Sequence, residues 1–353
     1  MTRPTEDDCG NAPNVRHGAK CNESAGRRKR VLITGCSGFV GRHLCHELRD
    51  GWLVRGAVRN RAATSLLPDG VESTFLDVTK LAGWDEALEG VDAVVHLVGR
   101  THVVRDRAAD PMMLYTETNV EGTRRTLAMC ERHGISRLVF VSSIKAVGEG
   151  EEEPYTEDSL CRPEDAYGIT KRRAEELLLE QRDAACVETV ILRPPLIYGA
   201  GVKGNFLRLL QAVELGLPLP LGRIKNARSM LYVGNLARSI RFLLQSPQWP
   251  SKIYHVVDND PPLSTPDLVR RIAALMRRTP RLLPCPVGLL KAGLTLVARR
   301  EDARRLTSSL VVDGTKLKEE LGWNPPIPAS DGLAETVDWY LRLREKRGSL
   351  ELG

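Results

Sequence analysis

Residues 31–41 read VLITGCSGFVG, an apolar run that ends in a turn with glycines at Gly35, Gly38 and Gly41. A helix-compatible stretch follows directly. The first glycine permits a tight turn, the second lets the backbone approach a pyrophosphate, and the third lets the helix pack close to the strand. The first amides of the helix would face the anion. The stretch therefore predicts a dinucleotide-phosphate site, although glycines with this spacing also occur in ordinary loops.

The residues beyond this turn alternate between strand-like and helix-like patterns. Strand candidates are 31–34, 53–58, 73–78, 93–97, 138–142 and 189–192, and helical patterns such as 39–49, 80–89, 119–133 and 164–182 lie between them. This α/β alternation predicts a parallel sheet covered by helices on both faces. Right-handed crossovers make it a doubly wound Rossmann sheet, whose ligand crevice lies at the carboxyl ends of the strands. The glycine turn falls at that edge.

The chain divides by pattern into three parts. Residues 1–29 carry mixed charge and few large apolar residues, so we interpret them as a disordered leader. Residues 30–193 form the predicted nucleotide-binding Rossmann domain. Residues 194–345 hold many prolines and short elements, which predict a smaller C-terminal substrate-binding lobe. A strand near 253–257 is expected to return to the Rossmann sheet.

Composition argues against several classes of protein. The 353 residues are 42% hydrophobic, which is ordinary for a soluble protein with a sizeable core. The net charge is +6, but the arginines are scattered and only 5% of residues are aromatic, so we predict no nucleic-acid partner. The apolar stretch 282–298 is broken by Pro284, Pro286 and Lys291 and is too short to span a bilayer. We therefore expect a cytoplasmic protein with no integral membrane segment.

The eight cysteines are dispersed, with no CxxC pair and no His cluster at zinc spacing. This pattern predicts free thiols in a reducing compartment and no metal site. Cys36 lies inside the glycine turn, but no partner base is near it in the sequence, so we do not expect it to be a nucleophile.

A second constellation carries acid–base chemistry. Tyr167 and Lys171 stand four residues apart in YGITK and so share one face of a helix, and Ser142 and Ser143 end a predicted strand. An ammonium beside the tyrosine, helped by a bound nicotinamide and its ribose, would lower the tyrosine pKa. The phenol could then exchange a proton with an alcohol or carbonyl oxygen while a hydride moves. A lone Tyr-x-x-x-Lys pair more often lies on an exposed helix face without a functional role. Here the glycine turn, the serines and the tyrosine follow in the order that one crevice requires.

Together these motifs resemble the extended short-chain dehydrogenase/reductase family, and specifically its nucleotide-sugar epimerase/dehydratase branch. The resemblance covers about residues 30–345. It rests on TGCSGFVG at 34–41, LDVT at 76–79, HLVG at 96–99, NVEGT at 119–123, VFVSSIKAVGE at 139–149, YGITK at 167–171 and LRPPLIYG at 192–199.

The resemblance implies roles for particular residues. Ser143 rather than Ser142 matches the catalytic serine, beside Tyr167 and Lys171. For the substrate diphosphate it implies Asn205, Arg228 and, more weakly, Arg305, although either arginine would otherwise be a solvated surface charge. The implied NAD(P) contacts are Gly35, Ser37, Gly38, Phe39, Val40, Gly41, Arg59, Asp77, Val78, Leu97, Val98, Gly99, Asn119, Tyr167, Lys171 and Pro194.

Two departures discriminate within this family. Dehydratases of the family place an Asp-Glu pair directly after the catalytic hydroxyl residue, whereas this chain has Ile144 and Lys145 there, so dehydration is not expected. Many relatives that prefer NAD place an acidic residue at the end of the second strand, where this chain has Arg59. An arginine can attract the 2′-phosphate of NADP, so we expect NADP(H) to be slightly favoured, unless Arg59 points into solvent.

The resemblance therefore implies hydride transfer at carbon 4 of a UDP-hexose or UDP-N-acetylhexosamine. We expect foremost a UDP-4-keto-sugar reductase of surface polysaccharide synthesis, with a UDP-glucose or UDP-N-acetylglucosamine 4-epimerase as the alternative. A catalytically silent NAD(P)-sensing regulator is the remote alternative, which the intact Ser143, Tyr167 and Lys171 disfavour. Relatives commonly form homodimers through the two helices that correspond to about 107–133 and 164–182, so a homodimer is expected.

Overall fold

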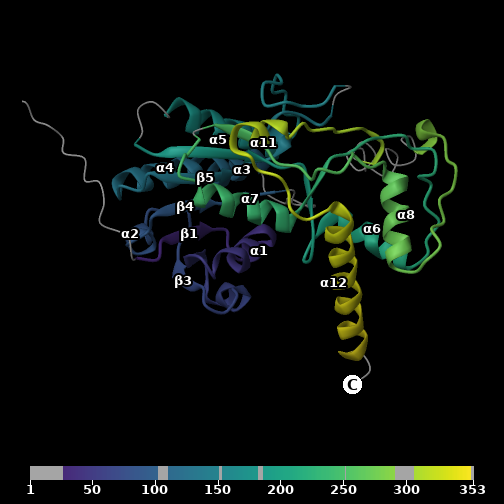
Figure 1. Cartoon of the computed structure of the whole chain (residues 1–353), viewed down its shortest axis with the longest axis horizontal. Helices are drawn as coiled ribbons and strands as arrows, with labels where there is room; N and C mark the ends of the chain where they lie inside the picture. The colour runs from purple at the N-terminus through teal and green to yellow at the C-terminus, as the bar shows by residue number, and fades with distance from the viewer. Residues whose placement is uncertain are drawn as a thin grey trace, which may run out of the picture.

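The computed structural model describes residues 27–101, 110–150, 153–181, 186–250, 252–290 and 306–350 (Figure 1). Its core is a sheet of seven parallel strands, which confirms the predicted Rossmann architecture. Across the sheet the strands are β3 (Glu72–Phe75), β2 (Leu53–Val58), β1 (Arg30–Thr34), β4 (Ala93–His96), β5 (Arg137–Val141), β6 (Glu188–Arg193) and β9 (Ile253–His255).

Helices cover both faces of the sheet because the side chains of each strand alternate between two apolar clusters. In β1, Val31 and Ile33 belong to one cluster and Leu32 to the other. The first face is covered by α1 (Phe39–Leu48), α7 (Val233–Gln245) and α11 (Thr315–Leu321). The second is covered by α2 (Trp84–Leu88), α4 (Gly122–Arg132) and α5 (Ala166–Glu180).

A smaller lobe lies beside the sheet, on the right of Figure 1. Pro194 and Pro195 separate it from β6, because proline cannot donate to a strand ladder. The lobe contains β7 (Leu196–Tyr198), β8 (Met230–Tyr232), α6 (Gly204–Glu214), α8 (Thr265–Leu275) and α12 (Ala329–Leu350), which share a third apolar cluster. None of the described helices is long and apolar enough to cross a membrane.

Three predicted boundaries were wrong. The strand expected over 73–78 ends at Phe75, because the Asp77 carboxylate accepts the Thr79 amide at 3.0 Å and turns the chain. The helix expected over 80–89 is only α2, which begins after Gly83 with φ of 90°. The helix expected over 119–133 starts earlier and is built from three consecutive segments: α3 (Pro111–Thr116), a π-helical turn η2 (Glu117–Glu121) and α4.

His96, at the end of β4, makes the stability of the fold depend on pH. Its Nδ1 lies 2.7 Å from the Thr34 hydroxyl, and burial, reinforced by the charge of Lys171, lowers its pKa to about 3. Below about pH 6.5 the imidazole ring is protonated in the unfolded chain but stays neutral in the folded chain. Stability that is present at neutral pH is therefore lost as the pH falls from about 6.5 towards 3, at up to about 1.4 kcal/mol per pH unit.

Replacing His96→Gln is expected to remove this dependence while leaving a hydrogen-bonding group beside Thr34. Between about pH 6 and pH 4 the free energy of unfolding of the wild type should fall faster than that of the variant, by about 1.4 kcal/mol per pH unit. Urea denaturation of both proteins at several pH values measures the two slopes. Equal slopes would show that His96 is not the neutral buried group described above.

Candidate active site

The glycine turn between β1 and α1 has the conformation expected for a phosphate cradle. Gly35 adopts φ of 75°, and the Gly38 amide donates to the Gly35 carbonyl at 3.0 Å. A Cβ on Gly41 would lie 2.3 Å from that carbonyl oxygen and 2.6 Å from Cα of Cys36. Any side chain at Gly41 would therefore push the helix away from the strand. These three glycines bring the start of α1 close to the carboxyl end of β1.

The N-terminus of α1 fits a bound pyrophosphate. Its N-cap, Gly38, has no side chain to occupy the first amides, and no acidic residue lies in the first turn to repel an anion. Ser37 is partly exposed at the turn, and Phe39 and Val40 are partly buried against the core of the smaller lobe. Cys36 is buried, and burial raises the pKa of its thiol to about 12, so it is no nucleophile near neutral pH.

The ends of β3 and β4 form the neighbouring wall of this crevice. A Cβ on Gly35 would lie 3.1 Å from the carbonyl carbon of Leu97, so the turn and the end of β4 are in contact. A Cβ on Gly99 would lie 3.3 Å from Nζ of Lys171, so this wall contacts a side chain of α5. Val98 packs against the core of the second face, and Val78 is buried beside Gly122.

The proposed catalytic residues Ser143 and Tyr167 come together from two elements. Ser143 follows β5 and is the N-cap of the short 3₁₀ turn η3 (Ile144–Ala146), while Tyr167 lies in the first turn of α5. The hydroxyl of Ser143 forms a hydrogen bond with the Tyr167 phenol. Both side chains are partly buried.

The pKa of Tyr167 is governed by burial in this structure. Burial raises it to about 12, despite the opposing hydrogen bond from Ser143, and the negative charge of Asp165 also raises it. The ammonium of Lys171, which we expect to lower this pKa together with a bound nicotinamide and its ribose, is directed elsewhere in this structure. Its Nζ donates to the Val141 carbonyl at 2.9 Å and lies 4.5 Å from the ring centroid of Phe140. The phenol is therefore a proton donor at neutral pH.

Lys171 is buried at the carboxyl end of β5. Burial lowers its pKa to about 8, against the opposing charge of Glu175, so the ammonium remains largely protonated at neutral pH. This cation lies between Gly99, which follows β4, and the end of β5, the strand that leads to Ser143. That position suits the orientation of a ribose hydroxyl.

Asn119, in the π-helical turn η2, contacts α5, the helix that carries Tyr167. It is fully buried, accepts the Arg100 amide at 2.7 Å, and donates to the Thr170 hydroxyl at 2.9 Å. Thr170 in turn donates to the Tyr167 carbonyl at 3.1 Å. Single π turns often occur at functional sites, where the extra residue redirects a side chain.

A buried ion pair that the sequence analysis did not predict holds α5 against the sheet. Arg193, at the end of β6, donates to Glu175 of α5 at 2.7 Å and 3.0 Å, and the two side chains are 1% and 0% exposed. Next to it, the Pro194 carbonyl accepts the Ile144 amide at 3.0 Å. The end of β6 and Pro194 thus contact both segments that carry the proposed catalytic residues. In the sequence, only the family motif LRPPLIYG at 192–199 marked this segment as part of the site.

Arg59 is exposed at the carboxyl end of β2, one residue before Asn60, which caps the 3₁₀ turn η1 (Arg61–Leu66). A second exposed arginine, Arg61, opens that turn. The position is the one at which a Rossmann sheet meets the adenosine ribose.

The predicted substrate residues lie in the lobe. Asn205 is exposed in the first turn of α6, with its Oδ1 3.2 Å from Nη1 of Arg208. Arg228 is partly buried, and its Nη1 donates to the Ser308 carbonyl at 2.9 Å. Arg305 lies outside the described residues. Asn205 and Arg228 come from separate segments of the lobe, and their joint binding of one diphosphate stays a prediction.

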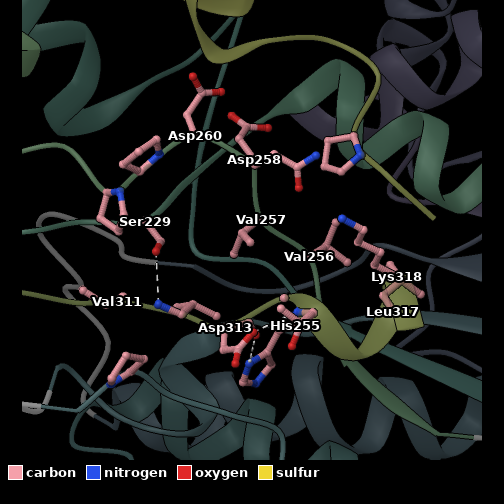
Figure 2. A pocket seen from close by; sticks show the side chains of 18 of the residues that line it. Ser229, His255, Val256, Val257, Asp258, Asp260, Val311, Asp313, Leu317 and Lys318 are labelled. Atoms are coloured by element: carbon pink, nitrogen blue, oxygen red, sulfur yellow. Dashed lines mark hydrogen bonds between the residues drawn. The ribbon is translucent and has the colours of Figure 1, made fainter. Parts of the chain in front are cut away.

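A pocket between β9 and α11 is lined by none of the proposed site residues. Figure 2 shows Asp258 and Asp260 on one side of it and His255 with Asp313 on the other. The Asp258 carboxylate accepts hydrogen bonds from Tyr198, Asn235 and the Tyr232 amide, which makes it a structural group of the lobe. Among the residues that the structure describes, no group of three or more His, Cys, Asp or Glu side chains could hold a metal ion.

Comparisons with known proteins give one consistent result. A family model described as "NAD dependent epimerase/dehydratase family" matches residues 31–256. The UDP-glucose 4-epimerase of Vibrio cholerae is 33% identical over 323 residues, which cover 90% of this chain and 97% of that protein.

Two further relatives extend the comparison. A protein of Escherichia coli O157:H7, named N-acetyl-alpha-D-glucosaminyl-diphospho-ditrans,octacis-undecaprenol 4-epimerase, is 30% identical, covering 88% of this chain and 94% of its own. The structure of the Thermus thermophilus UDP-glucose 4-epimerase in complex with NAD superposes with a TM-score of 0.71 at 25% identity, covering 88% of this chain and 99% of that one.

Proposed function

Because the chain belongs to the NAD dependent epimerase/dehydratase family and is an NAD-dependent enzyme, we propose that it is a 4-epimerase acting on a UDP-hexose or UDP-N-acetylhexosamine. The observation that carries the proposal is the hydrogen bond between Ser143 and Tyr167, together with the Lys171 ammonium, which lies beside Gly99 at the end of β5. Epimerisation takes precedence over the keto-sugar reduction expected from the sequence. The two relatives at 30% identity or more described above both have 4-epimerase names.

The residues of the chain divide the work of a hydride transfer. Bound nicotinamide would supply the hydride acceptor and donor. The Tyr167 phenol exchanges a proton with the oxygen on carbon 4, and the Ser143 hydroxyl polarises the same oxygen. Lys171 orients the ribose from its position beside Gly99 and the Val141 carbonyl. The glycine turn and the open amides of α1 bind the pyrophosphate, and Asn205 and Arg228 are proposed to meet the substrate diphosphate.

Dehydration is disfavoured by the two residues that follow Ser143. Ile144 is buried with an apolar side chain, and the Lys145 ammonium is held by Glu149 and Asp165. Neither residue is a free acid or base for the elimination of water.

The test is a panel of nucleotide sugars. Purified protein is incubated with UDP-glucose, UDP-galactose and their N-acetyl forms in the presence of NAD, NADH or NADPH, and products are separated by chromatography. Interconversion of 4-epimers without net consumption of cofactor supports the proposal. No epimerisation, together with stoichiometric oxidation of NADPH by a UDP-4-keto-sugar, overturns it in favour of a reductase.

The reductase stays the second candidate because Arg59 stands where many relatives that prefer NAD place an acidic residue, and its guanidinium can attract the 2′-phosphate of NADP(H). Replacing Arg59→Ala should lower the ratio of NADPH to NADH affinity about tenfold or more, since a charge-assisted phosphate contact contributes about 1.5–3 kcal/mol. Fluorescence titration with both cofactors measures the ratio.

Arg49→Ala is the matched control for this prediction. Arg49 is also exposed and lies 3.9 Å from Asp50, but it stands beyond the opposite end of α1. Its removal should leave the ratio unchanged. An unchanged ratio in Arg59→Ala as well would mean that Arg59 points into solvent and does not select the cofactor.

The homodimer and the cytoplasmic location remain predictions from the sequence and the family resemblance. Analytical ultracentrifugation of the purified chain checks the former, and cell fractionation checks the latter.

A further inference from the structure

Ser143 and Tyr167 belong to different segments of the chain, so their mutual position has to be set by something outside either side chain. Ser143 follows a strand, and Tyr167 begins a helix. Active-site groups must be held within about 0.5 Å of the productive geometry, and a misplacement of about 1 Å can cost about 100-fold in rate. Lys145 touches both segments.

The backbone of Lys145 is tied to the serine and to the helix. Its amide donates to the Ser143 hydroxyl oxygen at 3.3 Å. Its carbonyl oxygen packs against Gly168, where a Cβ would lie only 2.4 Å away. Gly168 is the residue directly after Tyr167, so the 3₁₀ turn and the first turn of α5 are in contact at this point.

The side chain of Lys145 adds a second tie. Its Nζ lies 2.5 Å from Asp165 Oδ2 and 2.5 Å from Glu149 Oε1. Asp165 is the N-cap of α5, and its other oxygen accepts the Gly168 amide at 2.7 Å. The side chains of Lys145, Asp165 and Glu149 are 15%, 20% and 14% exposed, so solvent screens the pairs only weakly. One carboxylate thus caps the catalytic helix and binds the lysine beside the catalytic serine.

We propose that Lys145 is a positioning residue, whose ammonium bridges Asp165 and Glu149 and so fixes the spacing between the Ser143 hydroxyl and the Tyr167 phenol. It contacts neither substrate nor cofactor in this role. The kinetic test of this proposal rests on the proposed hydride-transfer function, because it needs a reaction to assay. Dehydratases of the family place an acidic residue at this position for acid–base chemistry. In this chain Lys145 is proposed to hold two neighbouring segments at a fixed distance instead.

Replacing Lys145→Met removes the ammonium and leaves two carboxylates facing each other. We expect kcat to fall about 10- to 100-fold, while KM for the nucleotide sugar and Kd for the cofactor change less than about threefold. Lys145→Arg keeps the charge and should retain kcat within about fivefold of the wild type. Equal losses in Lys145→Met and Lys145→Arg, or a loss confined to KM, would overturn the positioning role.

Asp165→Asn separates the ion pair from the helix cap, because asparagine caps helices about as well as aspartate. It should lower kcat in the same way as Lys145→Met, and the double variant should lose little more, since both changes break one interaction. Losses that multiply in the double variant would contradict a single shared interaction. Arg124→Met, which removes the half-exposed pair of Arg124 with Glu121 on α4, is the control and should be neutral.

A readout without turnover keeps this test independent of the proposed function. Hydrogen exchange of the amide of Gly168, measured in peptides covering 165–170, should be about tenfold faster in Lys145→Met and near the wild-type rate in Lys145→Arg. Unchanged exchange in Lys145→Met overturns the inference even if no sugar is turned over. A wild type that turns over no UDP-sugar, with exchange accelerated in Lys145→Met, overturns the proposed function and leaves the positioning role standing.

Discussion

Tyr167→Phe is expected to lower kcat for the sugar reaction about 100-fold or more, which corresponds to about 2.7 kcal/mol of transition-state stabilisation. The variant loses only the phenol hydroxyl that accepts the Ser143 hydrogen bond. Steady-state kinetics measure the loss, and a titration with cofactor should give the wild-type Kd. The aromatic ring stays in place, so the melting temperature should change little.

Tyr254→Phe is the matched control for this variant. It also loses one phenol hydroxyl, which donates to Glu320 at 2.7 Å between α11 and β9, the edge strand that β6 separates from β5. Its kcat should stay within about twofold of the wild type, because the lost hydrogen bond is made to no catalytic group. Full activity in Tyr167→Phe would end the acid–base role of Tyr167.

The second large effect concerns stability. Arg193→Met leaves the carboxylate of Glu175 fully buried without its bidentate partner and should lower the free energy of unfolding by about 3–5 kcal/mol. Urea denaturation measures this loss. Because α5 carries Tyr167 and Lys171, activity should fall at temperatures at which the wild type is still fully active.

Two further variants show whether the loss comes from the buried carboxylate of Glu175 that Arg193→Met leaves behind. The double variant Arg193→Met with Glu175→Leu removes both charges and should recover most of the loss, since apolar replacements of buried pairs are often neutral. Arg270→Met breaks a half-exposed pair with Asp267 and should cost less than about 0.5 kcal/mol. A loss of under about 1 kcal/mol in Arg193→Met alone would contradict the role given to this pair.

The strand boundaries were predicted best where the turn after a strand requires a particular residue type. Three glycines at fixed spacing marked the end of β1 and the start of α1, because only glycine tolerates the contact between Gly41 and Gly35. The end of β3 was misplaced because the apolar pattern continues through Leu76 and Val78, while the Asp77 turn ends the strand. Local hydrogen bonding by an aspartate prevailed over periodicity there.

The ion pairs that hold the segments of the site together could not be predicted from sequence patterns. Lys145 reaches Asp165, 20 residues away, and Arg193 reaches Glu175, 18 residues away. A charge pattern does not say which partner a folded chain will supply. The raised pKa of Tyr167 depends in the same way on burial, which the Tyr-x-x-x-Lys spacing does not specify.

The central claim, reversible hydride transfer at carbon 4, is tested most directly with a substrate deuterated at that carbon. The purified protein is incubated in ordinary water with UDP-hexose or UDP-N-acetylhexosamine carrying deuterium on carbon 4, and both epimers are examined by mass spectrometry and NMR. Hydride transfer predicts that the deuterium stays on carbon 4 of the inverted product. Loss of the deuterium to water, or a product that has lost the elements of water, would contradict it.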